Sequence, residues 1–139
     1  MYGDTAAGRK RVAQLREQGG DIRALAARLV SQAEAVPWHG KAAEAMRVRI
    51  KERADHLRAA AAQHETAAES LARHLTEVDS LKEAIEVRAH KATSLVEDAR
   101  TRASEAGDAG SDGAEAALAA FDPPPAGHKD WLTVDLPGL

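Results

Sequence analysis

The stretch Val36-Pro37-Trp38-His39-Gly40 separates two long helical patterns and decides the fold. Pro37 ends the first pattern, because proline disfavours helical geometry at the residue before it and has no backbone N–H to donate. Gly40 follows three residues later, and glycine lets a backbone turn tightly. A second helical pattern begins directly after it. The stretch therefore predicts that the chain reverses between two helices.

The first helical pattern extends from about Thr5 to Val36. Its apolar residues recur at seven-residue steps or fill the same face, namely Val12, Leu15, Ile22, Leu25, Leu29 and Val36. This spacing is typical of a helix that packs against another helix. Gly19 and Gly20 interrupt the pattern, and a glycine inside a helix costs about 1 kcal/mol relative to alanine. We expect a weak point or kink there, with Asp21 able to cap a restart; two separate helices are the alternative.

The second helical pattern is longer, since no Gly or Pro occurs from Lys41 to Ala106. Its main heptad position holds Ala43, Ile50, Leu57, His64, Leu71, Val78, Ile85, Ala92 and Ala99, and its companion position holds Met46, Ala60, Ala67, Leu81 and Leu95. The first helix is about half as long, so it covers the second only to about Leu71. Beyond that point, either the chain folds back near Ser80, which begins a capping-box match, or a second chain covers the face. We favour an unbroken helix.

These patterns predict an all-α fold, an antiparallel helical hairpin with a very long second helix and a flexible acidic C-terminal tail. The expected helix-packing seam consists of Leu15, Ile22, Leu25, Leu29, Met46, Ile50, Leu57, Leu71, Val78, Leu81, Ile85 and Leu95. We place the helical hairpin or coiled-coil domain at residues 1–106 and the tail at residues 107–139.

The tail differs from the body in charge and in composition. Residues 1–104 carry 18 basic and 15 acidic residues, and residues 105–139 carry one basic and seven acidic residues, which together give the net charge of −3. A Gly-rich linker begins at Gly107, a short helix is expected from about Ala114, and three prolines follow Asp122. The apolar end from Trp131 to Leu139 suggests a segment that docks, either onto the chain's own body or onto a partner.

The composition excludes several classes of function. The chain has 139 residues, no cysteine and only 3% aromatic residues, so disulfides and thiol chemistry are ruled out. A net charge of −3 does not suggest nucleic-acid binding, and no stretch approaches the roughly 20 apolar residues of a membrane span. The charged N-terminus has no apolar run behind it, so we expect no cleavable signal peptide.

The six histidines do not have the spacing of a metal site. His56, His64, His74 and His90 lie eight, ten and sixteen residues apart on one expected helix, whereas ligands on a helix converge at spacings of three or four. No phosphate-binding loop, nucleophile elbow or catalytic triad is recognisable. The sequence therefore predicts a non-enzymatic protein with no cofactor and no metal.

The turn and its flanks resemble the WXG family of small type VII (Esx) secretion substrates and partners. In that family a Trp-x-Gly turn joins two antiparallel helices, and Trp38 and Gly40 match it, with Ala43 and Met46 continuing the pattern. The resemblance covers about Ala6 to Leu81. It implies that Trp38 anchors partner helices at the end of the seam, and that the chain is cytoplasmic before leaderless export, as a secreted or cell-surface protein.

The family's export signal is a tyrosine followed four residues later by an acidic residue, and this chain departs from it. The sole tyrosine is Tyr2, whereas Trp131 and Asp135 have the same spacing far downstream. We therefore regard Trp131 and Asp135 as a candidate export or docking segment. We expect the protein to form a homo- or heterodimer with another helical chain, for instance a second WXG-type protein or a larger secreted cargo. We further expect it to be exported by a type VII system or to pair with the cargo of that system. The alternative is a cytosolic coiled-coil adaptor without a role in secretion.

Overall fold

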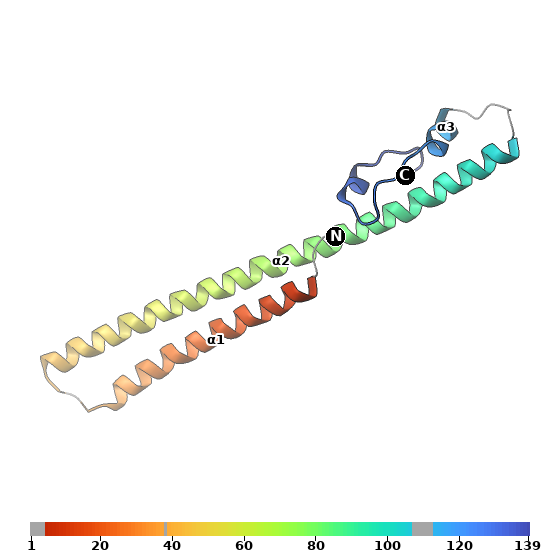
Figure 1. Ribbon diagram of the computed structural model, residues 1–139. Coiled ribbons are helices and arrows are strands. Elements are labelled where there is room, and N and C mark those ends of the chain that lie inside the picture. The colour runs from red at the N-terminus through yellow and green to blue at the C-terminus, as the bar shows by residue number, and fades with distance from the viewer. Residues whose placement is uncertain (1–4, 38, 107–112) are drawn as a thin grey trace. The chain divides into compact units, whose positions relative to one another are not determined.

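The computed structural model describes residues 5–37, 39–106 and 113–139. These residues form the helices α1 (Thr5–Ala35), α2 (Lys41–Ala106) and α3 (Gly113–Ala119) and the 3-10 helix η1 (Lys129–Thr133), without a strand among them (Figure 1). The prediction of an all-α fold with an antiparallel helical hairpin is confirmed.

Both long helices are continuous. α1 has 31 residues and passes through Gly19 and Gly20 as a helix, so the alternative of two separate helices is wrong. α2 has 66 residues and passes through Ser80, so the alternative of a fold back at that point is also wrong. The absence of Gly and Pro between Lys41 and Ala106 explains why α2 does not end earlier.

The turn between α1 and α2 is built around Gly40. Its φ is +100°, a left-handed value that favours glycine over residues with a side chain. Its carbonyl accepts a hydrogen bond of 3.1 Å from the backbone N–H of Glu44, in the first turn of α2. The Arg47 guanidinium donates to the Val36 carbonyl at 3.3 Å across the turn. Trp38 lies outside the described residues.

The contacts divide the chain into two compact units that meet within α2, one ending at Thr76 and the other continuing from Glu77. The first unit is the hairpin of α1 and the first part of α2. Its helices are antiparallel, because Gly8 lies against Leu75, and Gly19, further along α1, lies against Ala61.

In the second unit, residues 113–139 pack on the later part of α2. Its core joins Ile85, Ala92, Val96 and Ala99 of α2 to Leu118, Trp131 and Leu136. The sequence analysis left open whether the apolar C-terminal segment docks on the chain's own body or on a partner, and the structure shows the first. Because residues 113–139 pack on the later part of α2, the boundary between the two units lies within α2. The boundary expected from the sequence was the linker after residue 106.

Candidate protein-interaction site

Mostly small residues form the contact between the two helices of the hairpin, and Val12 and Leu75 add larger side chains to it. The buried positions of the hairpin recur mostly at seven-residue steps: Val12, Gly19, Ala26 and Ala33 on α1, and Ala43, Ala54, Ala61, Ala68 and Leu75 on α2. The backbones approach closely there, since a Cβ atom added to Gly19 would lie 3.3 Å from the Ala61 carbonyl oxygen. Glycine and alanine permit this approach because they place little or nothing between the two backbones.

Larger aliphatic side chains run beside this contact and are only partly buried. They stand three residues after each buried position of α1, at Leu15, Ile22 and Leu29 in the helix and at Val36 directly after it. On α2 they include Ile50, Leu57 and Leu71. Leu25 and Met46 are more open, with 48% and 41% of their surface exposed. The contact inside the hairpin therefore leaves much of its aliphatic surface in contact with solvent.

The helical phase places these larger side chains on one side of the hairpin. The two-fold axis that relates antiparallel helices is perpendicular to the plane of both helices, so equivalent heptad positions of the two helices lie on the same side of their contact. The larger residues follow the small ones by three positions on both helices. We call the resulting surface the aliphatic face, and its members are Leu15, Ile22, Leu25, Leu29, Val36, Met46, Ile50, Leu57 and Leu71.

The borders of the aliphatic face are basic. The heptad positions that flank it hold four exposed arginines, which are Arg11, Arg28, Arg49 and Arg53. Among the residues of the two helices at the same flanking heptad positions of the hairpin, one is acidic, namely Asp21. A positive border around an apolar centre favours a partner whose own border is negative.

The other side of the hairpin carries an ion pair between the helices. The Arg23 guanidinium donates two hydrogen bonds to the Glu65 carboxylate, at 2.6 and 2.9 Å. The hydrogen bond from Arg23 lowers the pKa of Glu65, and the same bond together with the negative charge of Glu65 raises the pKa of Arg23. Both side chains are more than two-fifths exposed, so the pair contributes to the register of the hairpin more than to its stability.

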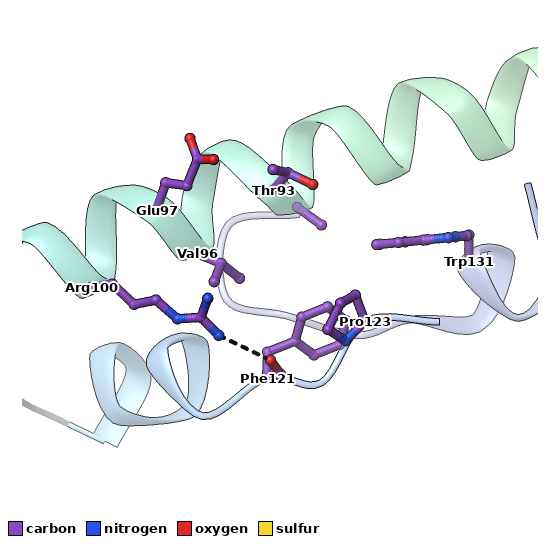
Figure 2. Close-up of a pocket in the computed structure, with 8 residues that line it drawn as sticks. Thr93, Val96, Glu97, Arg100, Phe121, Pro123 and Trp131 are labelled. Atoms are coloured by element: carbon purple, nitrogen blue, oxygen red, sulfur yellow. Dashed lines mark hydrogen bonds between the residues drawn. The ribbon is translucent and has the colours of Figure 1, made fainter. Parts of the chain in front are cut away.

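In the second unit, arginines of α2 bind main-chain carbonyls of the C-terminal segment. Arg88 donates to the carbonyls of Trp131, at 2.9 Å, and of Val134. Arg100 donates to the carbonyls of Ala119 and Phe121, at 3.3 and 3.4 Å, and Figure 2 shows it reaching Phe121. Ala119 ends α3 and Trp131 lies in the short helix η1, while Phe121 and Val134 follow these two elements. Carbonyls that are not used within a helix are available for such bonds.

The indole of Trp131 lies at the centre of the second unit. It is only 4% exposed, and its Nε1–H donates to the Pro125 carbonyl at 3.1 Å. Its ring lies 6.2 Å from that of Phe121, at an interplanar angle of 60°, a favourable arrangement for two aromatic rings. The ring of Trp131 therefore packs in the apolar core, while its N–H has a hydrogen-bond acceptor.

The cavity beside these rings is too small for a typical cofactor. It has a volume of about 120 Å³ and lies between Val96 and Arg100 of α2 and the rings of Phe121 and Trp131 (Figure 2). Ligand pockets usually have volumes of about 300 Å³ or more. Across residues 5–37, 39–106 and 113–139, no group of three or more His, Asp or Glu side chains is placed to hold a metal ion.

The structure separates the residues of the expected seam. Leu15, Ile22, Leu25, Leu29, Met46, Ile50, Leu57 and Leu71 belong to the aliphatic face, and in the second unit Ile85 is buried, Val78 and Leu95 are partly buried, and Leu81 is exposed. Trp131 is buried, whereas Asp135 is exposed. Most of the small residues that make the contact were not among the expected seam residues, although Gly19, Ala26 and Ala33 recur at seven-residue steps and could have revealed it.

The fold and this surface define an all-α helical-hairpin protein. Comparison of the chain with protein-family models, with curated proteins and with solved structures found no match. None of the helices in the described part of the chain is both long enough and apolar enough to cross a membrane.

Proposed function

We propose that this chain is a WXG-type hairpin protein, which pairs with another helical chain through the aliphatic face and is exported by a type VII system or pairs with its cargo. The single observation that carries the pairing is the order of burial in the hairpin. Apart from Val12 and Leu75, the residues buried between the helices are small, while the larger residues of the aliphatic face remain partly or largely exposed. A contiguous aliphatic surface of this kind is typical of a binding site for another protein.

The turn supports the resemblance to the WXG family. The glycine that corresponds to the end of the Trp-x-Gly motif, Gly40, adopts a positive φ directly before α2. The motif residue Trp38 precedes it by two positions in the sequence. The resemblance implies that this tryptophan anchors a partner, and aromatic side chains are strong anchors in protein interfaces.

The charges favour a different chain over a second copy as the partner. In a dimer of two copies, the arginines that border one aliphatic face would approach those of the other. Like charges brought together across an interface disfavour that pairing. We therefore propose a heterodimer with a helical hairpin that presents an acidic border around its own aliphatic stripe.

A matched pair of substitutions tests the use of the aliphatic face. Leu25→Glu places an acid on the face, and Val48→Glu places the same acid on α2 outside it; the native side chains are 48% and 50% exposed. Neither position is buried, so both variants should fold. We expect Leu25→Glu to weaken binding of a co-expressed acidic WXG-type chain about tenfold, which corresponds to roughly 1.4 kcal/mol, and Val48→Glu to leave it nearly unchanged. Equal affinities of the two variants would exclude this face as the binding site.

Export is tested separately from pairing. The secretion proposal predicts that the chain appears in the culture filtrate of its host, and that this depends on the type VII export ATPase. The adaptor alternative predicts that the chain stays in the cell whether or not the ATPase is present.

A further inference from the structure

The C-terminal segment covers the part of α2 that continues the partner-facing stripe. The seven-residue series of Ile50, Leu57, His64, Leu71 and Val78 continues along α2 as Ile85, Ala92 and Ala99. The members of this series in the hairpin, from Ile50 onward, are only partly buried. By contrast, Ile85, Ala92 and Ala99 are buried beneath residues 113–139. The later stripe is thus already occupied by the chain itself.

The bonds that hold the segment use main-chain carbonyls in η1 and directly after it. Arg88 binds the carbonyl of Trp131, in η1, and that of Val134, which follows η1. A guanidinium can serve two acceptors at once because its donors form a rigid fork. The middle of a partner helix would not offer the same contact, because its carbonyls are used in hydrogen bonds within the helix.

The packing of the segment on α2 also determines which of its side chains another molecule can contact. Trp131 is 4% exposed and Leu136 is 7% exposed, while Asp135 next to Leu136 is exposed. A receptor that recognises an aromatic side chain and an acid four residues later would reach the acid but not the indole. Recognition of both side chains requires the segment to leave α2.

We propose that residues 113–139 form a latch, which closes on α2 through Arg88 and withholds Trp131 from an export receptor until it opens. The link to export rests on the proposed function, because it depends on Trp131 acting as a signal, whereas the latch itself does not. Opening releases the indole and uncovers the stripe of Ile85, Ala92 and Ala99 in the same event. The chain would therefore present its signal and this additional apolar surface together.

Limited trypsin digestion of the full chain measures the opening directly. Lys129 is the only basic residue from Glu105 to Leu139, so tryptic cleavage in the latch can occur only there and releases the peptide 130–139. Mass spectrometry at early time points gives the rate of its release. Cleavage requires local unfolding of η1, so the rate follows the population of the open latch when opening and closing are fast.

Arg88→Ala should raise the rate of release roughly tenfold, because bonds from a charged donor are among the stronger protein hydrogen bonds. Arg73→Ala, which removes an exposed arginine of α2 before Thr76, is the matched control and should leave the rate unchanged. Trp131→Ala, which removes the buried ring and keeps Arg88, should raise the rate as well. Far-UV circular dichroism of each variant verifies that α2 remains helical.

The latch is refuted if Arg88→Ala and Arg73→Ala release the peptide at the same rate, or if the unaltered chain releases it as fast as Trp131→Ala does. Secretion of the same variants tests the link to export. Faster release from Arg88→Ala, combined with secretion that does not depend on Trp131, would retain the latch and reject Trp131 as the signal.

Discussion

Substitution of the two adjacent glycines of α1 separates helix propensity from packing. Gly19→Ala and Gly20→Ala both replace a glycine inside a helix with the best helix former, which contributes about 1 kcal/mol to stability. No atom lies within 4 Å of a Cβ atom at Gly20. We therefore expect Gly20→Ala to stabilise the hairpin by the full amount, about 1 kcal/mol.

At Gly19 the added methyl group meets the facing helix. Its carbon would lie 3.3 Å from the Ala61 carbonyl oxygen and 3.4 and 3.5 Å from the side chains of Glu65 and His64. The carbonyl belongs to the α2 backbone, which cannot rotate away as a flexible side chain can, so the backbones of the two helices must move apart locally to relieve the contact. Overpacking of this kind costs about 1–3 kcal/mol, which offsets or exceeds the gain in helix propensity.

The predicted difference in stability between the two variants is therefore about 1–3 kcal/mol, with Gly20→Ala the more stable. Thermal unfolding followed by far-UV circular dichroism would show it as a difference in Tm of several degrees, since 1 kcal/mol corresponds to about 4 °C in a chain of this size. Equal stabilisation by both alanines would mean that the helices are not in close contact at Gly19. That result would refute the packing of the hairpin through its small residues.

Two further predictions concern the ion pair and the turn. The hydrogen bond from Arg23 lowers the pKa of Glu65. The pair therefore contributes stability that is present above the ordinary glutamate pKa of 4.5 and is lost as the pH falls through the lowered value. When the Tm is measured at decreasing pH, it should decline less in Glu65→Gln than in the unaltered chain, and an identical decline would rule out this contribution. Trp38→Ala should weaken assembly with a partner chain while most of the helix content remains; sedimentation and circular dichroism measure the two effects, and an unchanged size of the assembly would argue against Trp38 as an anchor.

The helices were predictable because their signals are local. The run from Lys41 to Ala106 contains no residue that disfavours a helix strongly, and Pro37 and Gly40 mark the turn with their backbone preferences. At Gly19, where a weak point or kink was expected, α1 is continuous and packs closely against α2. The helix propensity of glycine describes its cost in an isolated helix. It does not include the closer approach of α2 that the lack of a side chain at Gly19 allows.

The packing of the hairpin was harder to predict than its helices. Hydrophobic periodicity gives most weight to large side chains, so it selected residues such as Leu29 and Leu57 as the seam, and these are only partly buried. Alanine contributes little apolar area, and its burial at Ala26 and Ala61 reflects how closely two backbones approach. The contact of Arg88 with the C-terminal carbonyls depends on how a distant segment folds back, which no local pattern specifies.

Side-chain footprinting of the complex tests the central claim most directly. A carbene or radical label would modify Leu25, Met46 and Val48 in the free chain, because all three are at least two-fifths exposed. After addition of an acidic WXG-type partner, the account predicts that labelling falls at Leu25 and Met46, on the aliphatic face, and persists at Val48. Persistent labelling at Leu25 and Met46 in a complex of confirmed mass would contradict it.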